Sequence, residues 1–134
     1  MTQQTQQYGV VPAEQIKGMD IMNPEGEDLG QIDEFFIDLE YGRLSHAAVS
    51  LGGGFPGMKG KLHAVPWQAF SWTPQGKRLV LNVDKQALKD SPGFDKDNYP
   101  DLGDRRWLGS VFNYFRQTPY WGIGEEGPDD MTRL

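Results

Sequence analysis

The chain has 134 residues and a formal net charge of −6, with 37% apolar residues, 17 glycines and 9 prolines. This length suits one compact domain with short appendages, and the glycine and proline content favours a turn-rich β structure. Basic residues are not concentrated in either half, so the counterion release that drives nucleic-acid binding is missing, and neither DNA nor RNA is expected as a partner. The absence of cysteine excludes disulfides, thiolate metal sites and thiol nucleophiles.

The N-terminal residues 1–13 are rich in glutamine and threonine, nearly uncharged and without periodicity, which predicts a flexible leader. They contain no basic region followed by an apolar one, so they do not resemble a signal peptide. No apolar run in the chain approaches the roughly 20 residues of a transmembrane helix. Together with the lack of cysteine, these observations predict a cytoplasmic protein without a transmembrane segment.

Residues 14–94 consist of short apolar runs separated by turn-forming residues, which predicts an all-β domain, a small barrel of about six strands. In the second run, Phe35, Ile37 and Leu39 alternate on one face while Ile32 is out of phase, which predicts a bulge near Asp33. The glycine-rich loop before residue 62 lacks the spacing of a phosphate-binding loop and the helix after it, so it is expected only to join two strands. The expected strands lie at 16–22, 28–40, 44–51, 62–67, 69–73 and 78–83.

Helical patterns begin after the last expected strand. Asp84 is a good N-cap for a short helix that ends before Ser91 and Pro92. Residues 95–134 are expected to form a C-terminal extension, and Asp104 can cap a second helix near 104–117. The apolar residues of this second helix form one stripe. They are Trp107, Leu108, Val111, Phe112 and Phe115.

Six motifs occur in a fixed order between residues 14 and 94. They are G-x-x-LG-x-I-x-E at 26–34, ID-x-x-x-G at 37–42, the glycine-rich loop, AVPW at 64–67, RLVLNV at 78–83 and L-x-x-SPGF ending at residue 94. This order resembles the PRC-barrel domain family. The later FDKDNYPDLGD and PYW segments are similar to the extensions of small stand-alone bacterial members, which are often described only as stress-associated.

The resemblance implies a small β-barrel that serves as a non-catalytic interaction or assembly module, with no catalytic residues to transfer. Short strands with open edges also favour a homodimer. A protein partner is therefore expected, and no cofactor or metal is assigned.

The candidate contact residues are aromatic and apolar side chains in the glycine-rich loop and the C-terminal extension. The stripe of the second helix can pack on its own barrel, bind a protein partner or contact a membrane surface. Alternatively, the loop and the tail aromatics can enclose a small ligand. The candidates are Phe55, Met58, Trp107, Phe112, Phe115, Tyr120 and Trp121.

Titratable residues give no catalytic or metal assignment. His46 and His63 are the only histidines, and a zinc site would need two carboxylates converging on both. Each is expected to be a surface or half-buried residue of its strand. Asp33, Glu34 and Asp38 are expected to point outward and to contribute solubility, because a barrel of this size has its interior filled by side chains.

Overall fold

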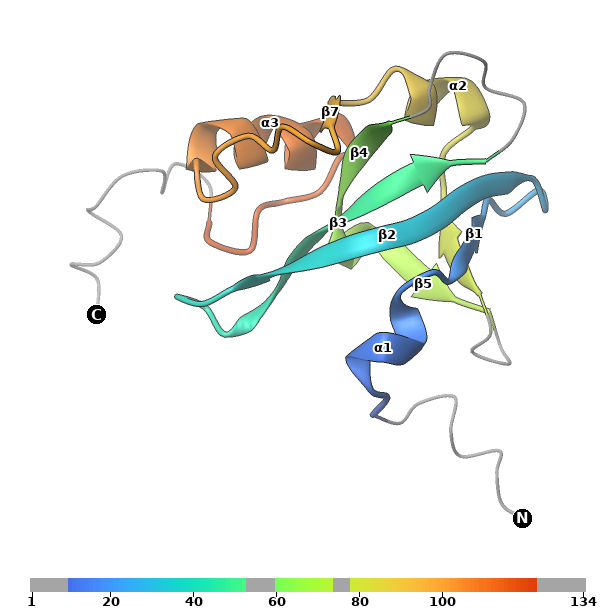
Figure 1. The fold of residues 1–134 in the computed structure, drawn as a ribbon, viewed down its shortest axis with the longest axis horizontal. Helices are drawn as coiled ribbons and strands as arrows, with labels where there is room; N and C mark the ends of the chain where they lie inside the picture. The colour runs from blue at the N-terminus through green and yellow to red at the C-terminus, as the bar shows by residue number, and fades with distance from the viewer. Residues whose placement is uncertain (1–9, 53–59, 74–77, 123–134) are drawn as a thin grey trace.

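The computed structural model describes residues 10–52, 60–73 and 78–122, and its main element is a seven-stranded sheet (Figure 1). The strand order is β5-β6-β1-β2-β3-β4-β7. Neighbouring strands are antiparallel except β1 and β6, which are parallel. The mainly β fold is therefore confirmed. The strands are β1 Asp20–Met22, β2 Asp28–Asp38, β3 Arg43–Leu51, β4 Lys61–Pro66, β5 Phe70–Trp72, β6 Leu79–Leu81 and β7 Gly93–Asp95.

The described sheet differs from the predicted barrel of about six strands in two respects. Gly93–Asp95, where no strand is expected from the sequence, pairs with β4 and adds a seventh strand. The described strands form an open order whose edges are β5 and β7. The first expected strand is also shorter, because helix α1 (Ala13–Ile16) precedes it. Gly18 then turns the chain with a φ of 81°, a conformation that glycine adopts without strain.

The long β2–β3 pair contains two register shifts. The shift between Ile32 and Glu34 confirms the predicted bulge, whereas the one between Phe36 and Ile37 was not predicted. Beyond the second shift, Ile37 is 59% exposed and Leu39 is 90% exposed. This shift skips Ser45 of β3 and adds no residue to β2, so Phe35 and Ile37 share one face as predicted, whereas Leu39 lies beyond the end of β2.

Both helices expected after the sheet are present. Asp84 caps α2 (Lys85–Lys89) by accepting a hydrogen bond from the Ala87 amide at 2.7 Å. Asp104 caps α3 (Arg105–Tyr114) by accepting one from the Arg106 amide at 2.9 Å. These contacts satisfy amide groups that have no partner inside a helix, and they confirm the two predicted caps.

Helix α3 ends in a Schellman motif three residues before the expected boundary of 117. The Gln117 amide donates to the Phe112 carbonyl at 2.9 Å, and the Arg116 amide donates to the Asn113 carbonyl at 3.0 Å. Arg116 has a φ of 58°, the left-handed conformation that glycine usually supplies at this position. An arginine here stores about 1 kcal/mol of backbone strain.

The apolar stripe of α3 joins the extension to the sheet. Val111 and Phe115 belong to the same core as the buried residues of the strands. Leu108 and Phe112 form a second cluster with Trp121. Figure 1 shows α3 beside β4 and β7, with the segment after it on the side of the β2–β3 hairpin. Of the alternatives left open for this stripe, the described structure shows packing on its own domain.

Candidate functional site

The turn between β2 and β3 is fixed by the carboxylate of Asp38. Its Oδ1 atom accepts hydrogen bonds from the Glu40 amide at 2.9 Å and the Tyr41 amide at 3.1 Å. The Asp38 carbonyl accepts a third from the Gly42 amide at 2.8 Å. An aspartate that bonds the backbone just after itself stabilises a tight turn. Gly42, with a φ of 65°, completes it.

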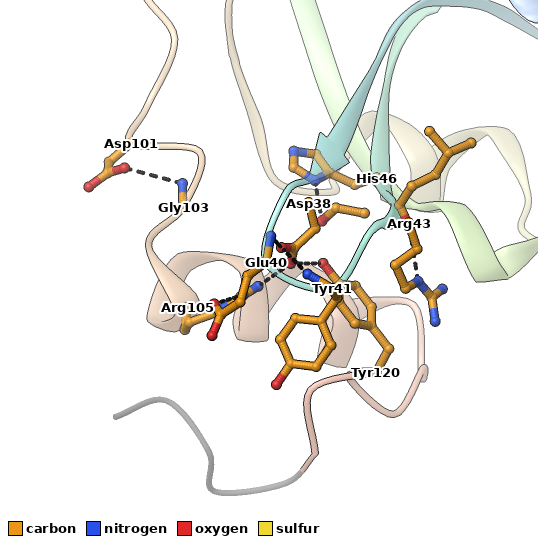
Figure 2. A network of polar contacts seen from close by, with 11 residues as sticks. Asp38, Glu40, Tyr41, Arg43, His46, Asp101, Gly103, Arg105 and Tyr120 are labelled. Carbon is orange, nitrogen blue, oxygen red and sulfur yellow. Dashed lines mark hydrogen bonds and ion pairs between the residues drawn. The ribbon is translucent and has the colours of Figure 1, made fainter. Parts of the chain in front are cut away.

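Arg105 of α3 clamps this turn from the other side (Figure 2). Its Nη1 atom lies 2.9 Å from Asp38 Oδ2, and its Nη2 atom lies 3.3 Å from Glu40 Oε1. The guanidinium carbon is also 4.7 Å from the centre of the Trp121 ring and 5.5 Å from that of Tyr41. The Arg105 side chain is 17% exposed and that of Asp38 is 8% exposed. A single cation therefore joins the hairpin, the helix and the tail.

Tyr120 completes the clamp from the C-terminal segment. Its hydroxyl donates to Asp38 Oδ2, and the guanidinium of Arg43 lies 4.1 Å from the centre of its ring. Burial raises the pKa of Asp38, but hydrogen bonds from Tyr120 and Arg105 outweigh it, so this pKa lies below its usual value of 3.8. Burial and the bond to Asp38 raise the pKa of Tyr120. At neutral pH, the carboxylate is charged and the phenol is not.

Asp38 therefore does not point outward, as its sequence context suggested. The expectation of a solubilising surface carboxylate is wrong, because Arg105 of α3 and Tyr120 of the tail cover the Asp38 side chain, which is 8% exposed. Four donors, two from side chains and two from backbone amides, replace the water that this carboxylate loses. A charged group can be buried when hydrogen bonds and an opposite charge offset the free energy of losing its water.

His46 of β3 lies behind this network. It is 1% exposed, and its Nδ1 atom is 2.9 Å from Ser45 Oγ. Its ring lies 4.7 Å from that of Phe36 and 5.8 Å from that of Trp107, measured between centres. Burial lowers the pKa of His46 to about 4. The imidazole is therefore neutral at neutral pH, and the expected surface or half-buried position is wrong.

His63 of β4 is buried as well, at 3% exposure, so the same expectation is wrong for it. Its Nδ1 atom is 3.1 Å from Ser91 Oγ, and burial lowers its pKa. Neither histidine reaches solvent. In the parts of the chain that the structure describes, no three histidine, aspartate or glutamate side chains gather as metal ligands would.

The structure separates the predicted contact residues into three groups. Phe112, Phe115 and Trp121 are buried at 0%, 7% and 2% exposure. Trp107 and Tyr120 are partly buried beside them. Phe55 and Met58 lie outside the described residues. A role of these seven residues in partner binding stays a prediction.

The sequence patterns predict Tyr120 as a contact residue but not the roles of Ile37, Asp38, Leu39 and Arg105 at this site. They place Ile37 and Leu39 on one face of a strand and Asp38 on the surface. The ID-x-x-x-G motif held a usable signal, because an aspartate four positions before a glycine is typical of a capped turn. Arg105 has no such local signal, since its partner Glu40 lies 65 positions away.

The family model of the PRC-barrel domain matches residues 9–88, more than half of the chain. The chain belongs to the PRC-barrel family. PRC-barrel domains are in general non-catalytic modules. The match includes β1 to β6 and Asp38, whereas Arg105 and Tyr120 lie in the extension beyond it. No curated protein matches the chain. None of the helices in the described parts is both long enough and apolar enough to cross a bilayer.

Proposed function

We propose that this PRC-barrel protein is a non-catalytic interaction module that contacts a partner protein with the tip of its β2–β3 hairpin. The supporting observation is the exposure of Ile37 and Leu39, at 59% and 90%, on a turn that Arg105 clamps. Single exposed apolar residues are common on protein surfaces. Two of them on a turn held by buried charges form a preorganised contact element, which lowers the entropy cost of binding.

The clamp itself favours a binding role over a purely stabilising one. Breaking water contacts around Asp38 and Arg105 costs free energy that their mutual attraction only partly returns. A pair of apolar residues would hold the turn to α3 without that cost. The charged clamp instead holds the hairpin in one orientation relative to α3. Its ion pair with Glu40 and the hydrogen bond from Tyr120 to Asp38 form only when these groups lie at the right distance.

Photo-crosslinking tests this proposal. A benzophenone amino acid placed at Leu39 should form an adduct with the partner in cells, whereas the same group at Lys89 on exposed α2 should not. Adding Ile37→Asp to the Leu39 variant should abolish the adduct. Identical adducts from positions 39 and 89, or none from position 39, would contradict a role of the hairpin tip.

The mass of the adduct also separates two kinds of partner. A homodimer, which we propose as a narrower possibility, gives an adduct of twice the 15.1 kDa chain mass. The open edge strand β5, where Trp72 is 38% exposed, supports this form. Any other mass indicates a different protein. Light scattering of the purified chain checks the homodimer independently.

A cytoplasmic location and an association with stress are also proposals of this kind, and microscopy of a tagged chain before and after stress tests both. The ligand-binding alternative and the membrane-surface alternative stay predictions. The ligand-binding alternative depends partly on Phe55 and Met58, which lie outside the described residues. The membrane-surface alternative depends on the apolar stripe of α3, which packs against its own domain.

A further inference from the structure

A groove of about 1070 Å³ lies away from the hairpin tip. It runs between the β1–β2 turn, the segment that joins β6 to α2, and the C-terminal end of α3. Its apolar lining includes Leu81, Val83 and Phe115, of which Leu81 and Phe115 belong to the main core. Leu81 and Phe115 are 1% and 7% exposed, so the accessible apolar surface comes mainly from the partly buried Val83 and Ala87 above these rigid core side chains.

The charged lining of the groove is mostly acidic. Glu25, Glu27 and Asp84 contribute three carboxylates, and Arg116 contributes one cation. A surface with this excess of negative charge attracts positively charged partners and repels acidic ones. The groove therefore favours a cationic occupant.

Two of these carboxylates are held in place. Asn23, which is 1% exposed, donates from Nδ2 to Glu27 Oε1 at 2.8 Å and accepts from the Glu27 amide at the same distance. Asp84 bonds the Ala87 amide through Oδ1 as the cap of α2. Because these side chains are already ordered, a cation that binds them does not have to fix their rotamers.

Tyr114 adds an aromatic surface in the same negative field. Tyr114 is 41% exposed, and its hydroxyl donates to the Ala87 carbonyl at 2.7 Å. Burial raises the pKa of Tyr114, and the charges of Asp90 and Asp84 raise it further. The same charges attract a cation, and an aromatic ring face attracts one as well.

The arrangement of the charges indicates how the cations of the occupant are distributed. No three carboxylate or histidine side chains converge within the described residues, so the groove does not offer one point ion a full set of ligands. Carboxylates from the β1–β2 turn and from the N-cap of α2 instead line the groove together with apolar residues. An extended peptide alternates its side chains between two sides, so it can place cations against the carboxylates and apolar groups against the apolar lining.

We propose that this groove binds an extended segment of a partner protein in which lysine or arginine alternates with apolar residues. The inference is independent of the hairpin tip, because the groove and the tip share no residue. The occupant is thus a basic, amphipathic peptide rather than a metal ion or an acidic polymer.

Fluorescence anisotropy tests the proposal with the full chain and a labelled peptide of about seven residues that alternates lysine and leucine. The variant Glu25→Gln/Asp84→Asn should bind about tenfold more weakly, since each lost ion pair is worth up to about fivefold at an exposed site. Asparagine remains a good N-cap, so α2 is preserved. The control Asp33→Asn/Asp97→Asn changes the net charge equally outside the groove and should bind like the wild type.

Further variants sharpen the result. Arg116→Gly removes the one cation at a position that prefers glycine, and it should tighten binding. Leu39→Ser should bind normally, which separates this groove from the proposed hairpin function. Peptides with glutamate for lysine, or serine for leucine, should bind weakly. The proposal would be overturned if the two double variants bound the peptide with equal affinity. It would also be overturned if the lysine–leucine peptide did not bind at low salt, or if the peptide with serine for leucine bound equally well.

Discussion

Replacing His46 with phenylalanine should remove a large part of the loss of stability that we expect between neutral and mildly acidic pH. The imidazole is 1% exposed and its pKa falls from 6.5 in the unfolded chain to about 4 in the folded one. Between these two values the unfolded chain binds more protons, so the free energy of unfolding decreases as the pH falls. Each pH unit in this window is worth about 1.4 kcal/mol.

The expected size follows from the two pKa values. Lowering the pH from about 7.5 to about 5.0 leaves the folded imidazole mostly neutral while the unfolded one is protonated, which costs about 2 kcal/mol. His63 contributes in the same direction, because its pKa is lowered too. In the wild type the free energy of unfolding should therefore fall by at least this amount over that range. In His46→Phe the fall should be smaller by about 2 kcal/mol.

Urea unfolding at the two pH values measures this difference. Phenylalanine fits between the rings of Phe36 and Trp107 that flank the imidazole, and any fixed cost of the lost bond to Ser45 cancels between the two pH values. Val49→Ala, at a fully buried position of the same strand, is the control, because it lowers stability but keeps the histidine. Equal pH dependence in the wild type and His46→Phe would show that the imidazole is not held neutral by burial.

Three further substitutions test the clamp and the backbone by urea unfolding at neutral pH. Arg105→Met leaves the buried carboxylate of Asp38 without its cation and should lower the free energy of unfolding by about 2 kcal/mol; no loss would mean that the ion pair is replaced by water. Arg116→Gly should raise it by about 1 kcal/mol, because glycine adopts a φ of 58° without strain. Gly30→Ala should lower it by more than about 3 kcal/mol or prevent folding, because a Cβ atom there would lie 2.1 Å from the Ser50 carbonyl oxygen.

Local signals in the sequence were sufficient for the parts of the fold that local forces decide. The phase slip before Phe35 predicted the first bulge, and Asp84 and Asp104 predicted two caps. The stripe of α3 predicted which of its faces is buried, because a 3.6-residue period fixes that face whatever the helix packs against.

What the sequence could not show depends on contacts between distant residues. Strand β7 has only three residues and is recognisable only through its pairing with β4. Tyr120 lies 82 positions from Asp38, so no spacing rule connects them. Both histidines are polar residues in half-apolar strands, and their burial follows from the aromatic rings and serines that the fold places around them.

The alternation of β2 links these distant contacts to the proposed function. Phe36 and Asp38 share one face of the strand, where Phe36 packs against His46 and Tyr99 and Asp38 contacts Arg105. Ile37 lies on the opposite face near the end of the strand, where it is 59% exposed, so the same alternation exposes an apolar side chain at the tip and brings Asp38 within reach of Arg105. An exposed contact surface and the charged clamp behind it therefore have a common structural origin, and a partner that binds the tip would contact a part of the hairpin that the extension holds in place.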